Sequence, residues 1–155
     1  MGIFDKVKSI ARKLTGSSAK VFVDCDPIKF GEPFEVRIKA EIKDENISID
    51  RVYLNVVGTE LVKAQTSDQV RNSDGSTRTQ TRTVELSHET YKDEITVKGA
   101  SNLVANQTYD WKIQVEIPEG SLPIYHGFNA RHGYYVRAGL DMSGNDPDSG
   151  WVELK

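Results

Sequence analysis

Apolar and polar residues alternate strictly along residues 34–42, and this pattern constrains the fold of the chain most. Successive side chains of a β-strand point to opposite faces, so the alternation predicts a strand with one buried and one solvated face. Valine and isoleucine together number 26 against 8 leucines, a bias that favours strands over helices. Helical periodicity is almost absent from residue 19 onward. We predict further strands at residues 21–25, 49–57, 91–97, 107–117, 133–142 and 150–154.

The predicted strands indicate a β-sandwich. Several short strands separated by turn-forming residues are typical of sandwiches and barrels, and apolar alternation on single faces favours two antiparallel sheets packed face to face. The predicted fold class is all-β, an antiparallel immunoglobulin-like β-sandwich in residues 19–155. Residues 1–18 are expected to form a short N-terminal amphipathic helix and linker. Within 49–57, Val52, Leu54 and Val56 share one face, and Gly58 indicates a bulge or a close approach.

The N-terminal segment differs from the rest of the chain in charge. Residues 1–20 carry five basic residues and one acidic residue, a net charge of +4, so the remaining residues carry −7 of the total of −3. The apolar residues of this segment fall within an arc of about 120° on a helix, which is the width of an amphipathic stripe. The residues predicted to bind a membrane or a partner are Ile3, Phe4, Lys6, Val7, Lys8, Ile10, Arg12, Lys13 and Leu14.

Three surfaces could bury this apolar stripe. A short isolated helix is marginal in water, so the stripe needs a partner. The first surface is the sandwich of its own chain, the second is another copy of the protein, and the third is an anionic membrane, which lysines beside an apolar face would suit. The expected location is the cytoplasm, with peripheral membrane contact in the third case.

A long polar hairpin is predicted between residues 59 and 88. Asp74-Gly75 is a turn signal, and the returning strand places Thr77, Thr79, Thr81 and Thr83 on one face. Both faces are polar, so the hairpin is expected to project from the core. Arg78, Gln80 and Arg82 form the other face, either as a solvated ribbon or as a strand that pairs with a partner. A net charge of −3 and the absence of interleaved aromatic residues argue against nucleic-acid binding.

No motif predicts catalysis, a cofactor or a metal. Cys25 is the only cysteine and is interpreted as an inert thiol within a strand. His126 and His132 are interpreted as ordinary residues of one loop, 118–132. The acidic stretch that starts at Asp141 matches only the first positions of a calcium loop, because Asp146 replaces the required glycine. The protein is therefore not expected to be an enzyme.

The segment between residues 109 and 154 carries a family resemblance. A strand that ends in Ile-Pro is followed by Leu122-Pro123-x-Tyr125-x-Gly127 and then by Tyr134-Tyr135-Val136-x-Ala138. This arrangement resembles the arrestin-like superfamily, and within it the bacterial sporulation-control protein family, as does the stretch of residues 19–62. The resemblance implies a single N-terminal-type arrestin sandwich, whereas arrestin-like proteins usually carry two. Pro118 and Pro123 would force a crossing between sheets, and Tyr125 and Tyr134 would bury rings with bonded hydroxyls.

The resemblance implies an interaction protein rather than a catalyst. The predicted function is a non-catalytic arrestin-like scaffold or regulator that binds other proteins, with the N-terminal helix as its membrane contact. The alternative is a self-assembling structural sandwich in which the helix or the hairpin edge joins copies into a homo-oligomer.

Overall fold

The computed structural model describes residues 18–155, which form strands and connecting loops. One sheet has the order β1-β2-β7, and a second has the order β10-β9-β4-β5 with β8 paired to β9. A two-stranded sheet, β3-β6, closes one end. The strands are β1 (Ala19–Cys25), β2 (Phe34–Ile42), β3 (Ile47–Ile49), β4 (Arg51–Arg71), β5 (Thr77–Lys98), β6 (Ser101–Leu103), β7 (Thr108–Val115), β8 (Tyr125–His126), β9 (Ala130–Asp141) and β10 (Val152–Glu153).

The two larger sheets pack face to face, and all pairings between named strands are antiparallel. The predicted all-β antiparallel class is therefore confirmed. Alternation in β2 buries every second residue, and β9 does the same with Tyr134, Val136 and Ala138. These side chains fill the space between the sheets with those of β1 and β4. The predicted helix of residues 1–18 lies outside the described residues except for Ser18.

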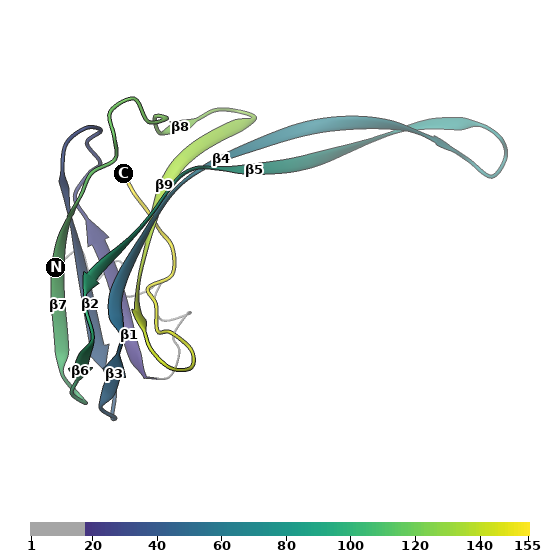
Figure 1. Cartoon of the computed structure of the whole chain (residues 1–155). Coiled ribbons are helices and arrows are strands. Elements are labelled where there is room, and N and C mark those ends of the chain that lie inside the picture. The colour runs from purple at the N-terminus through teal and green to yellow at the C-terminus, as the bar shows by residue number, and fades with distance from the viewer. Residues whose placement is uncertain (1–17) are drawn as a thin grey trace.

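The hairpin of β4 and β5 leaves the sandwich as a long arm (Figure 1). β9 pairs with β4 only as far as Val62, and residues 63–71 then pair with 77–85 alone. Most of the side chains in this two-stranded stretch are exposed, and the others are half-buried. The prediction of a projecting polar hairpin is confirmed, and Gly75 at the turn has a positive φ of 88°.

The prediction of two separate strands at 76–88 and 91–97 was wrong. The structure has one strand, because a bulge at Thr90 absorbs the extra residue: Gly58 pairs with Tyr91, and Thr59 pairs with Glu89. The predicted close approach at Gly58 is confirmed. A Cβ at Gly58 would lie 2.8 Å from Thr90 Oγ1 and 2.9 Å from Tyr134 Cε1.

The connection from β7 to β9 crosses between the two large sheets, as its prolines predicted. The Tyr134 hydroxyl donates a hydrogen bond to the Leu122 carbonyl oxygen at 2.7 Å, and the Tyr125 hydroxyl donates to Glu60 Oε1. The prediction that His132 belongs to a loop was wrong, because His132 is a buried residue of β9. Its Nδ1 donates to the Pro123 carbonyl oxygen at 2.9 Å, and its Nε2 lies 2.7 Å from Thr90 Oγ1.

Candidate functional site

The residues that the sequence predicts to bind partners occupy two separate places. The basic and apolar residues of the N-terminal segment, from Ile3 to Leu14, lie outside the described residues. Arg78, Gln80 and Arg82 lie on the exposed arm, where they face the residues of β4 that pair with them. Arg82 contacts that strand through its side chain: its Nε lies 3.5 Å from Asp68 Oδ2 and 3.3 Å from Thr66 Oγ1.

A groove that the sequence did not predict runs along the outer face of the sheet β10-β9-β4-β5. It consists of three connected hollows with volumes of about 380, 430 and 280 Å³. The first two share Val57 and Trp151, and the last two share Leu61 and Arg131. We call this the outer groove, lined by Tyr53, Val57, Leu61, Tyr135, Arg137 and Trp151.

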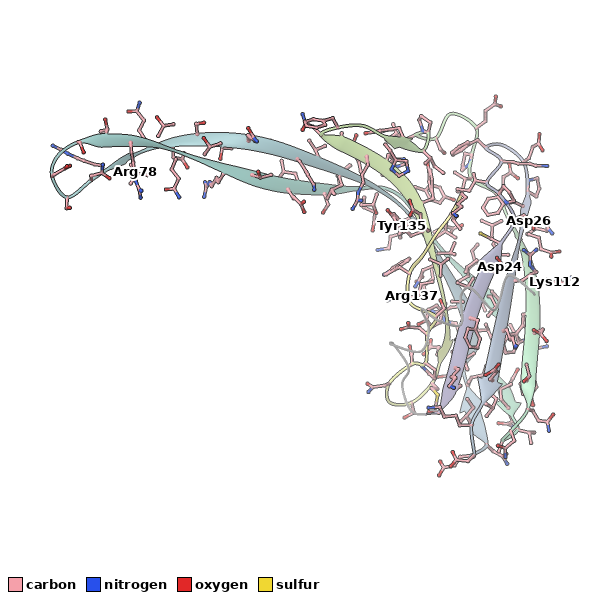
Figure 2. All side chains as sticks on the ribbon, turned by 180° about the vertical axis from the view of Figure 1, so that it is seen from behind. Asp24, Asp26, Arg78, Lys112, Tyr135 and Arg137 are labelled. Carbon is pink, nitrogen blue, oxygen red and sulfur yellow. The ribbon has the colours of Figure 1, made fainter. Side chains whose placement is uncertain are left out.

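Strand alternation places these side chains. Tyr135 and Arg137 alternate with the buried Tyr134 and Val136, so they face away from the core. Val57 of β4 lies beside Tyr135 in register. Figure 2 shows Tyr135 and Arg137 on the face of the sandwich below the arm, with Tyr135 close to the root of the arm.

One end of the outer groove is lined by an ion-pair network. Arg51 binds Glu94 at 2.5 Å and Asp141 at 3.1 Å. The hydrogen bonds that the Arg51 guanidinium donates to Asp141 and Glu94 raise the pKa of this guanidinium, so it stays charged. Arg51 thus neutralises one of the two negative charges that these carboxylates carry.

Arg137, which lines the same hollow as Arg51, has unused hydrogen-bonding capacity. Its guanidinium carbon lies 4.7 Å from the centroid of the Trp151 ring, a cation–π geometry that orients the planar group. Its Nε is buried and has no hydrogen-bond partner in the described part of the chain. A buried N–H without an acceptor costs free energy.

The other end of the groove carries an exposed aromatic side chain. Phe128 lies in the turn between β8 and β9 and is 99% exposed. Gly127 and Ala130 close this turn through a backbone hydrogen bond of 2.7 Å. A Cβ at Gly127 would lie 2.9 Å from the Ala130 carbonyl oxygen, so glycine is required for the tight turn that presents Phe128.

Outside the outer groove, we examined the side chains that could act as a nucleophile or bind a metal ion. Burial raises the pKa of the Cys25 thiol to about 12, and the nearby Asp24 carboxylate contributes, so the reactive thiolate is suppressed. Among residues 18–155, no group of three or more histidine, cysteine or acidic side chains could hold a metal ion. Over the same residues, no helix is long and apolar enough to cross a membrane.

Part of the outer groove could be anticipated from the sequence. Alternation predicts that Tyr53, Asn55 and Val57 face away from Val52, Leu54 and Val56, as the structure has them. The stacking of Arg137 on Trp151 has no such signal, because it depends on how residues 142–151 fold back over β9.

Comparisons with known proteins show a similarity of fold. No protein-family model matches the chain, and no curated protein matches it. Among solved structures, the chain is similar to Spo0M, a sporulation control protein from Bacillus subtilis, with a TM-score of 0.58 and 15% sequence identity. The match covers 90% of this chain and 49% of the Spo0M chain, so this chain spans about half the length of the structure it matches. The described residues therefore have a β-sandwich fold that is similar to the fold of Spo0M.

Proposed function

We propose that this protein is a non-catalytic scaffold or regulator that binds an extended segment of another protein along the outer groove. The observation that carries the proposal is Phe128, which is 99% exposed at one end of the groove. Aromatic residues, phenylalanine among them, are enriched in the surfaces with which proteins bind partners.

The lining of the groove supports a peptide as the ligand. Val57, Leu61 and Tyr135 offer apolar contact, and Arg131 and Arg137 form no ion pair with a carboxylate of residues 18–155. We expect the bound segment to place an acidic side chain or a carbonyl group on Arg137 and an apolar surface against Phe128. The regulatory role of Spo0M that its name states, sporulation control, supports a regulatory interaction over catalysis.

Peptide selection tests the proposal whatever the identity of the partner. A displayed library of random extended peptides is selected on the full chain, and the affinities of the selected peptides are measured by titration. We expect Phe128→Ser and Arg137→Gln each to weaken binding at least about tenfold, which corresponds to about 1.4 kcal/mol.

The matched control is Val104→Ser, which removes a half-exposed apolar side chain outside the groove and should leave the affinities unchanged. Selected peptides whose affinity is the same for all three variants would exclude the outer groove as the binding surface.

A second candidate function, self-assembly, is favoured by the edges of the arm. β5 is the last strand of its sheet in the described chain, and β4 loses its partner β9 beyond Val62. Free strand edges can pair with another copy. Light scattering tests this candidate on the full chain and on a chain in which a two-residue turn replaces residues 63–85. Loss of the oligomer in the second chain supports self-assembly, and a monomer in both chains contradicts it.

A further inference from the structure

Phe22 lies on the face of the sandwich opposite the outer groove, and its burial is unexpected. Its neighbours in β1, Val21 and Val23, point into the core, so Phe22 points to the outer face of the sheet β1-β2-β7. Phe22 is nevertheless only 1% exposed, and it is not part of the core cluster between the sheets.

The described neighbours of Phe22 on this outer face are polar. Lys39 pairs with it in register, and its Nζ lies 5.8 Å from the ring centroid. The other outward positions of the three strands, as the alternation and the register place them, are Lys20, Asp24, Glu35, Arg37, Glu41, Thr108, Asp110, Lys112 and Gln114. The stem of a lysine covers one side of a ring, whereas complete removal of a phenyl ring from water needs an apolar cover.

The chain itself supplies a cover of suitable composition and reach. The Ser18 carbonyl oxygen accepts a hydrogen bond from the Lys43 backbone N–H at 3.1 Å, which anchors the chain immediately before β1. Phe22 follows four residues later, about 13 Å along the strand. An extended linker of residues 15–18 also spans up to about 13 Å, so the predicted stripe that ends at Leu14 can reach Phe22.

The overall charge of the chain favours the same docking. On this side of the sandwich, Asp24, Asp26 and Glu35 bind the guanidinium of Arg37, and Glu35 also lies 3.7 Å from Lys112 Nζ. Residues 1–17 carry a net charge of +3, whereas the other residues of the chain carry −6. Basic residues beside the apolar stripe are thus attracted to the sandwich.

We propose that residues 1–17 dock their apolar stripe over Phe22 on the outer face of β1-β2-β7, within the same chain. The outer face of the sheet is then a binding site for the chain's own N-terminal segment, and the stripe is withheld from membranes while the segment is docked. The site lies on the opposite sheet from the outer groove, so both sites can be occupied together.

Hydrogen exchange measured by mass spectrometry on the full chain tests the docking. We expect backbone amides of residues 3–14 to exchange at least about tenfold more slowly than in an unstructured peptide of the same sequence. Phe22→Asp should abolish this protection. Gln114→Asp makes the same change of charge on the same face but two strands away, and it should leave the protection intact.

Two further readouts make the result decisive. Protection of the β4 and β9 amides shows that the Phe22→Asp variant is folded, and Ile10→Asp tests the contact from the other side. With vesicles of phosphatidylserine and phosphatidylcholine, the Phe22→Asp variant should float and the unaltered chain should not. Docking within the chain is excluded if residues 3–14 of the unaltered chain exchange without protection. It is also excluded if their protection rises with protein concentration, as docking on a second copy would require, or if the unaltered chain floats as strongly as the variant.

Discussion

Gly58 is the position where a single added methyl group is expected to have the clearest effect on stability. In the substitution Gly58→Ala, the new Cβ would lie 2.8 Å from Thr90 Oγ1, 2.9 Å from Tyr134 Cε1 and 3.1 Å from Tyr91 Cβ. The Tyr134 ring is fully buried and its hydroxyl is bonded to the Leu122 carbonyl oxygen, so the ring cannot move away freely. Overpacking of this kind costs about 1–3 kcal/mol.

The net effect is smaller than the overpacking cost, because alanine in a strand is favoured over glycine by about 0.5–1 kcal/mol. The two terms leave about 0–2.5 kcal/mol, so we expect Gly58→Ala to lower the free energy of unfolding by about 1 kcal/mol in urea titrations with an unchanged m-value. The corresponding fall in Tm is about 2–4 °C for a chain of this size.

The control is Gly99→Ala, whose Cβ would meet no atom within 4 Å. Gly99→Ala should be neutral or stabilise by up to about 1 kcal/mol through the unfolded state. If the two variants unfolded with free energies within about 0.5 kcal/mol of each other, the close packing around Gly58 would not constrain this strand, and the reasoning would be refuted.

Three other measurements test other parts of the structure. Thr90→Val removes the hydroxyl that lies 2.7 Å from the buried His132 Nε2 and should lower the free energy of unfolding by about 1–3 kcal/mol in urea titrations. Thr90→Ser keeps the hydroxyl and should lower it less, and equal losses in the two variants would contradict a hydrogen-bonding role. Cys25, with its pKa raised from 9.0 to about 12, should react with iodoacetamide at pH 8 on the order of a thousandfold more slowly in the folded than in the unfolded chain, and equal rates would show an accessible thiolate. Replacement of residues 63–85 by an Asn-Gly turn removes no buried side chain and should leave Tm within a few degrees, whereas a large fall would show that the arm stabilises the sandwich.

The sequence predicted the strands that are half-buried and missed those whose limits depend on distant partners. The alternation of β2 and the faces of residues 52–57 follow from residue type alone, because one face meets the core. The continuity of β5 could not be predicted, since residues 87–90 are polar on both faces and the bulge at Thr90 exists only in register with Gly58. His132 was misplaced for the same reason: its burial depends on hydrogen bonds to Thr90 and Pro123, which are distant in sequence or across a turn.

The same contacts tie the arm to the outer groove. His132 lies in β9 between Arg131, which lines the groove, and Gly133, which pairs with Thr59 of β4. Its ring bonds Thr90, the bulged residue of β5, and the Pro123 carbonyl oxygen in the connection that leads to Phe128. Because the Pro123 carbonyl oxygen only accepts, Nδ1 donates to it, and Nε2 lies within hydrogen-bond distance of the Thr90 hydroxyl. One buried side chain thus joins the bulge of β5 to the connection that leads to Phe128. A partner that displaced the arm would have to break these bonds. We therefore expect the groove to bind its ligand while the root of the arm stays fixed, and only the two-stranded stretch beyond Val62 to bend.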